Sequence, residues 1–128
     1  MKILAIDAGS RYAGLALADD RIKIALPYKV LEIKSQDVLF EELKEIVKQE
    51  KIEKIVIGQP IGLSGRQTKQ TEIINQFIKE VKEQIELPVV VIDERLTSKM
   101  ADKLLSDNKE NHAVAASIIL QNYLDKKV

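Results

Sequence analysis

Apolar and polar residues change their spacing along the chain. The first part holds apolar runs separated by residues typical of turns, with Gly9 and Ser10 after the first run and Asp19 and Asp20 after the second. Such runs predict strands, and tight turns between them predict an antiparallel meander. The third run contains Pro27, at which we expect a bend or an interruption. The three expected strands cover residues 2–7, 12–18 and 22–33.

Helical spacing replaces this pattern in the rest of the chain. Apolar residues recur there every three or four positions, which is typical of amphipathic helices. Ser35 or Asp37 can cap the first helix, and Asp107 with Glu110 is typical of a capping box before the last one. Helices are expected at 38–48, 73–81, 97–105 and 109–124, and short buried strands at 55–57 and 89–92.

The predicted order is three strands, then helix, strand, helix, strand and two helices. The later alternation of strands and helices implies parallel strands joined by helical crossovers. Together with the meander, it predicts an α/β protein with a mixed five-stranded sheet and helices against that sheet. No repeat, low-complexity tract or linker interrupts the 128 residues. We therefore expect a single domain over residues 1–128.

Composition removes several functional classes. The 20 Lys and Arg residues balance 20 Asp and Glu residues, which excludes a strongly basic, histone-like binder but leaves room for a local basic groove. The absence of Cys excludes disulfides, thiolate nucleophiles and zinc–thiolate sites. The apolar runs fall far short of the roughly 20 residues that a membrane helix needs, and the N-terminal run is too short for a secretory signal. We therefore expect a cytoplasmic protein with no membrane partner.

Acidic residues follow two of the expected strands. Asp7 ends the first strand, and Asp93 and Glu94 end the fifth. The carboxyl ends of parallel strands meet at one edge of a sheet, where two carboxylates with water and substrate phosphate make a magnesium site. Two such ions support phosphodiester hydrolysis. The alternative is that Asp7 only shapes a turn and that Asp93, Glu94 and Arg95 form a solvated ion pair.

A polar loop precedes the second expected helix. It contains Arg66 and Lys69, which can contact phosphate beside the positive N-terminal end of that helix. The alternative is a solvated linker with ordinary surface cations. The loop is not a phosphate-binding P-loop, because the Gly-Lys-Ser/Thr ending is missing.

Five segments in this order resemble the YqgF family, whose members are described as pre-16S ribosomal RNA nucleases or Holliday junction resolvases with an RNase H-like fold. The resemblance covers nearly the whole chain. Its first motif alone is weak, because actin-like ATPases share it. The five segments are ILAIDAGSRYAGLA at 3–16, IVIGQP at 55–60, Ser64-Gly65 with the helix after it, DERLTS at 93–98 and AASIILQNYL at 115–124.

The resemblance implies a role for each matched residue. Asp7 would be the central metal ligand and Glu94 the second acidic residue, with Mg²⁺ or Mn²⁺ as the ion. The remaining matched residues would organise the DERLTS motif or lie beside the substrate and its phosphates: Ser10, Arg11, Arg95 and Thr97. The implied substrates are structured RNA and branched DNA.

One position departs from the family pattern. Family members typically have Asp just before the Ala-rich part of the last helix, where this chain has His112. Imidazole is a poor ligand for magnesium but an acceptable one for manganese. His112 is therefore a candidate metal ligand, general base or proton shuttle. The alternative is that the third ligand is lost and His112 is a surface residue.

Two function classes remain open. The first is a metal-dependent endonuclease that uses Asp7, Glu94 and His112. The second is a catalytically impaired nucleic-acid-binding or scaffold module of the same fold, which the missing third acid motivates. An actin-like ATPase would place its nucleotide between two domains, and 128 residues supply only one. A resolvase of branched DNA would need two active sites and hence a homodimer.

Overall fold

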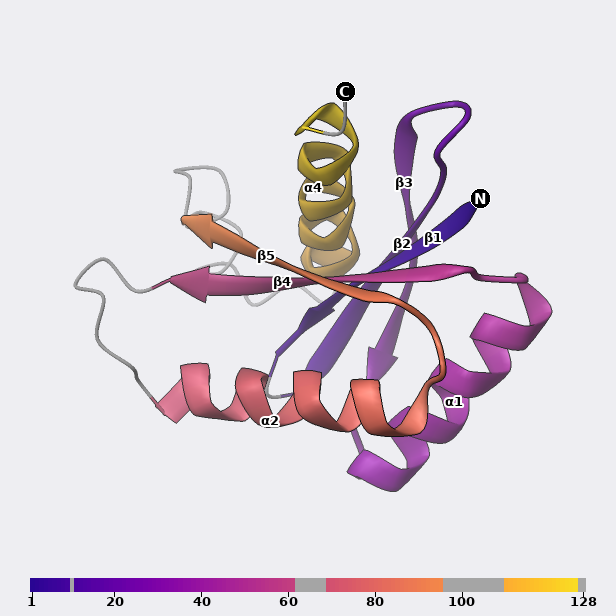
Figure 1. Cartoon of the computed structure of the whole chain (residues 1–128). Helices are drawn as coiled ribbons and strands as arrows, with labels where there is room; N and C mark the ends of the chain where they lie inside the picture. Colours follow the sequence, from indigo (N-terminus) through magenta and orange to yellow (C-terminus); the bar gives the residue numbers. More distant parts are fainter. Residues whose placement is uncertain (10, 62–68, 96–109, 127–128) are drawn as a thin grey trace.

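The computed structural model describes residues 1–9, 11–61, 69–95 and 110–126, with the backbone alone at 60, 61, 69–71, 93–95 and 110. Its elements follow the predicted order (Figure 1). The helix expected at 97–105 and the capping residue Asp107 lie outside the described residues. The elements are β1 (Lys2–Ala8), β2 (Tyr12–Asp19), β3 (Ile24–Glu32), α1 (Gln36–Gln49), β4 (Lys54–Ile61), α2 (Lys69–Gln84), β5 (Val89–Arg95) and α4 (Glu110–Lys126).

The strands form one five-stranded mixed sheet in the order β3-β2-β1-β4-β5. The antiparallel meander of β1, β2 and β3 is confirmed, and so are the parallel pairs of β4 with β1 and of β5 with β4. After α1 the chain does not pair β4 with β3, but returns to the free edge of β1. The strand β1 therefore lies at the centre, where antiparallel and parallel halves of the sheet meet.

The edge strand β3 contains the expected irregularity. Leu15 pairs with Lys29 while Ala16 pairs with Pro27, so Tyr28 is an extra residue on β3. Such a β-bulge bends one strand and increases its twist. Proline is tolerated here because an edge strand needs ladder hydrogen bonds on one side only. The strand continues through Pro27, which is thus a bend and not an interruption.

Two helices pack against one face of the sheet. On α1, Ser35 accepts a hydrogen bond from the backbone N–H of Val38 at 3.2 Å, which settles the choice of cap in favour of Ser35. The aromatic rings of Phe40 on α1 and Phe77 on α2 meet at 5.7 Å between centroids. Helical spacing predicts one apolar stripe on α2, formed by Ile73, Ile74, Phe77, Ile78 and Val81. The last four are buried, but Ile73 is exposed. These helices and the sheet enclose the larger of the two cores.

The helix α4 covers the opposite face of the sheet (Figure 1). Four of the nine buried residues of its core are alanines, which lets the helix axis come close to the strands. The alanines of this core are Ala5, Ala16 and Ala18 on the sheet and Ala116 on α4, and the larger side chains of α4 in it are Ile119, Leu120 and Leu124. Because α4 lies close to β1 and β2, the residues of its first turn come to lie beside the end of β1.

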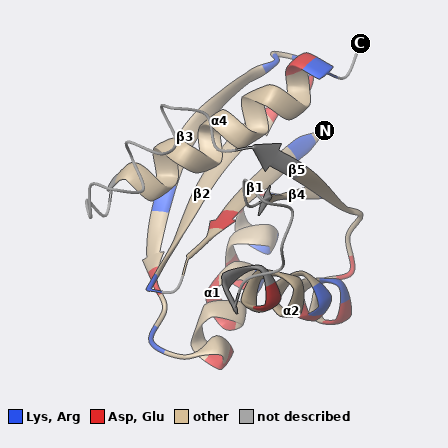
Figure 2. Cartoon of the chain, turned by 90° about the vertical axis from the view of Figure 1, so that its left-hand side faces the viewer, with Lys and Arg blue, Asp and Glu red and all other residues tan. Residues whose placement is uncertain are grey.

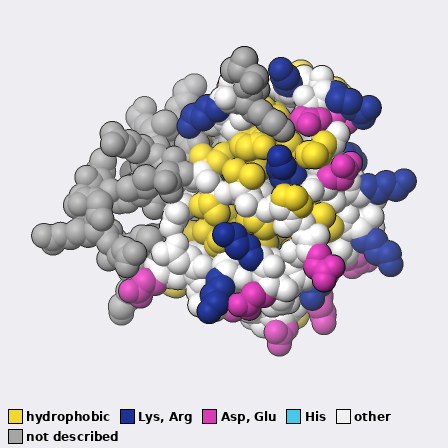
Figure 3. All heavy atoms as spheres, in the orientation of Figure 1, with side chains coloured by type: hydrophobic (Ala, Val, Ile, Leu, Met, Phe, Trp, Pro, Cys, Tyr) yellow, Lys and Arg dark blue, Asp and Glu magenta, His cyan; other side chains and the backbone are white. Residues whose placement is uncertain are grey.

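The second edge strand, β5, is apolar on both faces. Val89 and Val91 pack against the core under α1 and α2, whereas Val90 and Ile92 pack against the core under α4. All four are only partly buried, and no other strand of the described residues pairs with this edge. Figure 3 shows hydrophobic side chains on this side of the molecule, with Lys and Arg between them.

Within the described ranges, no helix is long and apolar enough to cross a membrane.

Substitution of Leu120 by Ala tests whether α4 is held by this second core. Leu120 is fully buried, so the change should lower the free energy of unfolding by about 2–5 kcal/mol. The matched control is Lys44→Ala on the exposed face of α1, for which we expect a change within about 0.5 kcal/mol. Urea unfolding followed by circular dichroism measures both. Equal, small changes in the two variants would contradict the packing of α4 on the sheet.

Candidate functional site

Three strands end at the same side of the sheet. Figure 2 looks onto this side, with α4 above it and α2 below. Ile6, near the end of β1, pairs with Ile57 in the middle of β4, and β4 then continues to Ile61. Further along, Pro60 on β4 pairs with Glu94 on β5. The structure therefore places the backbones of the two predicted acidic residues, Asp7 on β1 and Glu94 on β5, at the same side of the sheet, with β4 between the two strands.

Asp7 lies directly beside the first turn of α4. Its Oδ2 atom is 3.8 Å from Nδ1 of His112, and the Asp7 and His112 side chains are 20% and 22% exposed. This distance is longer than a hydrogen bond, which for N–H···O is about 2.7–3.2 Å. The structure thus brings two of the three predicted catalytic residues together at a place that solvent reaches.

Gly14 explains how the helix comes so close. Gly14 is the partner of Asp7 in the β1–β2 ladder. A Cβ atom added at Gly14 would lie 1.9 Å from the backbone oxygen of His112 and 2.6 Å from the backbone nitrogen of Ala113. The first turn of α4 therefore rests on the bare backbone of β2. Only glycine provides this space, and it places residue 112 over the end of β1.

The β1–β2 turn supplies a second wall for the imidazole. Gly9 donates a backbone hydrogen bond to the carbonyl of Tyr12 at 2.9 Å, which closes the turn. A Cβ atom added at Gly9 would lie 3.3 Å from Cε1 of His112, so the ring edge lies against this glycine. The Tyr12 ring lies 5.7 Å from the His112 ring between centroids, at an interplanar angle of 47°.

Tyr12 is a site residue that sequence reasoning missed. The guanidinium of Arg11, a predicted substrate contact, lies 5.5 Å from the centroid of the Tyr12 ring, at favourable cation–π range. Arg11 is exposed. Arg11, Tyr12 and His112 thus form a row beside Asp7. The contact of Tyr12 with His112 joins distant parts of the chain, and no local pattern predicts it.

Several predicted site residues cannot be placed as side chains. Ser10, Arg66 and Thr97 lie outside the described residues, and for Glu94, Arg95 and Lys69 the structure describes the backbone only. Lys69, expected in the loop before the second helix, is the first residue of α2. Among the side chains that the structure describes, no three His, Asp or Glu residues gather in a metal-binding group.

A further polar contact links β4 to α2. The amide of Gln59, at the end of β4, donates a hydrogen bond to Oδ1 of Asn75 on α2. Sequence reasoning did not select either residue, although both are polar positions close to the expected strand end and helix start. The contact holds the first half of α2 against the side of the sheet at which Asp7 and Glu94 lie.

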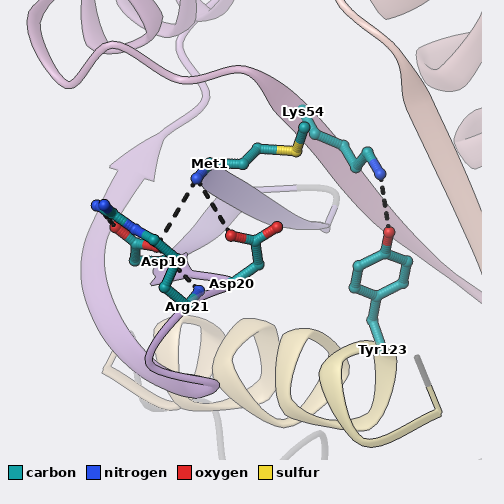
Figure 4. Close-up of polar contacts among 6 residues, drawn as sticks. All are labelled: Met1, Asp19, Asp20, Arg21, Lys54 and Tyr123. Atoms are coloured by element: carbon teal, nitrogen blue, oxygen red, sulfur yellow. Dashed lines mark hydrogen bonds and ion pairs between the residues drawn. The ribbon is translucent and has the colours of Figure 1, made fainter. Parts of the chain in front are cut away.

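The opposite end of the sheet has its own polar contacts (Figure 4). The terminal amino group of Met1 donates a hydrogen bond to Asp20 at 3.1 Å, and Lys54 donates one to the hydroxyl of Tyr123 on α4 at 3.1 Å. Two side-chain hydrogen bonds from Arg21 hold the pKa of Asp19 well below its ordinary value. These contacts lie far from Asp7 and anchor the start of β1 and the end of α4.

Solved structures show the class of fold. Thermus thermophilus RuvC matches with a TM-score of 0.63 and 14% identity, covering 97% of this chain and 94% of that chain. The fowlpox virus Holliday junction resolvase matches with a TM-score of 0.56 and 14% identity, covering all of both chains. These likenesses, with the mixed sheet in the order β3-β2-β1-β4-β5, confirm the predicted RNase H-like fold.

Sequence comparison shows the family. Residues 1–126 match RuvX, described as Holliday junction resolvase. A protein of Maridesulfovibrio salexigens named "Putative pre-16S rRNA nuclease" is 38% identical, covering 97% of this chain and 98% of its own length. A Rickettsia africae protein of the same name is 37% identical, covering 96% and 85%. The chain belongs to the RuvX family of nucleases, also called YqgF, which confirms the resemblance.

A pair of glycine variants tests how α4 is positioned. Gly14→Ala should lower the free energy of unfolding by about 3 kcal/mol or more, because the new methyl group meets the backbone of His112 and the helix must move. Gly58→Ala is the matched control, since its methyl group meets the side chain of Ile119 and no backbone atom within the three nearest contacts, and it should cost about 1–2 kcal/mol. Denaturant unfolding of both variants measures the difference. A Gly14→Ala variant as stable as Gly58→Ala would contradict this account.

Proposed function

We propose that this chain is a metal-dependent endonuclease that hydrolyses phosphodiester bonds in structured nucleic acid. The observation that carries the proposal is the placement of Asp7 beside His112 at the side of the sheet where β1, β4 and β5 end. Membership of a nuclease family supports it. Ribosomal RNA precursors are the favoured substrate, because relatives 37–38% identical along nearly the whole chain are named as nucleases of pre-16S ribosomal RNA. Branched DNA is the second candidate substrate, because the matching family is described as Holliday junction resolvase.

The residues present fit one divalent ion. Atoms that bind the same ion at about 2.1 Å lie at most about 4.2 Å apart, and Oδ2 of Asp7 and Nδ1 of His112 satisfy this at 3.8 Å. A carboxylate suits both Mg²⁺ and Mn²⁺, and imidazole suits transition ions. Asp7 and His112 would hold the ion, with Glu94 at the end of β5, on the other side of β4, as a proposed further ligand. When bound, the ion supplies Lewis acidity and activates water for attack on phosphorus.

The chain's own residues set up the rest of the reaction. Asp7 is partly exposed, so a phosphodiester can reach its carboxylate. Arg11 is exposed next to the site and is proposed to bind a neighbouring phosphate, since guanidinium matches phosphate geometry. The Tyr12 and Gly9 contacts hold the imidazole of His112 toward Asp7. Because the imidazole is already oriented, it need not be reordered when the substrate binds.

The first test of the function is cleavage by an Asp7→Asn variant. The native chain should cut a structured ribosomal RNA precursor with Mg²⁺ or Mn²⁺ and not with a chelator. Asp7→Asn should lower the cleavage rate by about 100-fold or more, because the loss of a metal ligand removes several kcal/mol of transition-state stabilisation. Asp37→Asn, an exposed change on α1, is the matched control and should cut normally.

A four-way DNA junction in parallel reactions distinguishes the substrates. Cuts in the RNA alone favour ribosomal RNA processing. Cuts in the junction favour resolution and require two copies of the chain on one molecule. Binding without cleavage by either ion, from a folded protein, would contradict the enzyme and support the binding or scaffold module instead.

Arg11→Ala tests the proposed phosphate contact. The variant should bind RNA more weakly. The negative slope of the logarithm of the association constant against the logarithm of the salt concentration should become shallower by about 0.7–0.9, as expected for one phosphate contact fewer. Lys82→Ala removes an exposed cation near the far end of α2 and serves as the control. Filter binding or fluorescence anisotropy over a salt series measures both slopes. Equal slopes in the native chain and Arg11→Ala would refute the contact.

A further inference from the structure

We propose that His112 is a direct ligand of the ion that Asp7 binds, and that it makes the site selective for Mn²⁺ over Mg²⁺. This inference rests on the proposed function, because it concerns the same site. It goes further by assigning the metal preference of the site to the nitrogen donor of His112. It also explains the departure from the family pattern as a change of metal and not as the loss of a site.

The distance between the two side chains carries the first step. Nδ1 of His112 faces Oδ2 of Asp7 at 3.8 Å. This is too long for a direct hydrogen bond, yet within the separation of two ligands on one ion. Both side chains are about one-fifth exposed, so an ion and its remaining water ligands have access from solvent.

The way the imidazole is held carries the second step. The backbone of His112 rests on Gly14, and the Cε1 edge of the ring lies against Gly9, where a methyl group would crowd it at 3.3 Å. The ring of Tyr12 lies at 5.7 Å on another side. Gly14 thus places the backbone of residue 112, whereas Gly9 and Tyr12 contact the imidazole itself and orient it. Such orientation of the ring before the ion binds suits a metal ligand.

The donor chemistry carries the third step. Mg²⁺ prefers oxygen ligands in near-octahedral geometry and seldom takes imidazole. Mn²⁺ accepts both carboxylate and imidazole, and nitrogen donors favour transition ions over Mg²⁺. A site with carboxylates alone would hold both ions, whereas the Asp7–His112 pair favours Mn²⁺. A histidine that acts only as a general base would leave the relative affinity for the two ions unchanged.

The chain contains a single histidine, which makes the test unambiguous. With any purification tag removed, Mn²⁺ bound to the native chain should show ¹⁴N couplings in electron spin echo envelope modulation, and imidazole of His112 is their source. Asp7→Asn should abolish this bound Mn²⁺ signal. Asp37→Asn is the control that should leave the signal unchanged. This readout needs no substrate and no turnover.

His112→Asp tests the selectivity. Affinities for Mn²⁺ and Mg²⁺ are measured by calorimetry and by competition against the Mn²⁺ signal, after circular dichroism has shown that the variant is folded. The variant should lose the ¹⁴N couplings, and its preference for Mn²⁺ over Mg²⁺ should fall by about tenfold or more. Mn²⁺ binding without ¹⁴N coupling in the native chain, undetectable Mn²⁺ binding, or an unchanged preference in His112→Asp would each overturn the inference.

These outcomes separate the inference from the proposed function. If the chain cleaves RNA in an Asp7-dependent way while bound Mn²⁺ shows no ¹⁴N coupling, the nuclease stands and the role of His112 is refuted. If ¹⁴N coupling and Mn²⁺ selectivity are found but neither nucleic acid is cut, His112 is a ligand and the proposed nuclease activity is refuted.

Discussion

The site depends on one close approach, that of the first turn of α4 to the backbone of β2 at Gly14. A methyl group at this position would overlap the backbone of His112. Backbone cannot move aside as the end of a side chain can, so glycine is a requirement here and not a convenience. Because Gly14 is paired with Asp7, the same contact that seats the helix also brings His112 to the end of β1.

The rest of the fold supports this contact from both sides. Alanines on β1, β2 and α4 keep the helix close along its length, and Ile119 and Leu120 fill the wider space beyond them. On the other face, α1 and α2 bury the larger core and hold the central strands in place. The candidate site thus lies at the end of the sheet where β1, β4 and β5 finish, and the polar contacts at the other end anchor the chain.

Local patterns predicted most of the elements but not their neighbours. Apolar runs and helical spacing located every strand and helix that the structure describes, because burial on one face imposes a fixed period. The pairing of β4 with β1 was not predictable from β3 and α1 alone. Ile73 was placed on a buried stripe but is exposed, since helical spacing does not show where the covering sheet ends.

The candidate site shows the same division. Asp7 was found from its place after a buried strand, whereas the importance of position 112 came from resemblance to the family. Tyr12 was missed because its contact with His112 joins the start of β2 to α4, and no short-range pattern records such packing. The structure in turn places Glu94 only by its backbone, at the end of β5 next to Pro60.

The central claim is that Asp7 and His112 together bind one ion at the end of β1. The most direct measurement is an anomalous difference map from a crystal of the native chain soaked in Mn²⁺. The account predicts one strong peak within bonding distance of both Oδ2 of Asp7 and Nδ1 of His112, with the imidazole still against Gly9 and Tyr12. A peak on Asp7 with His112 turned away, or no peak at this end of the sheet, would contradict it.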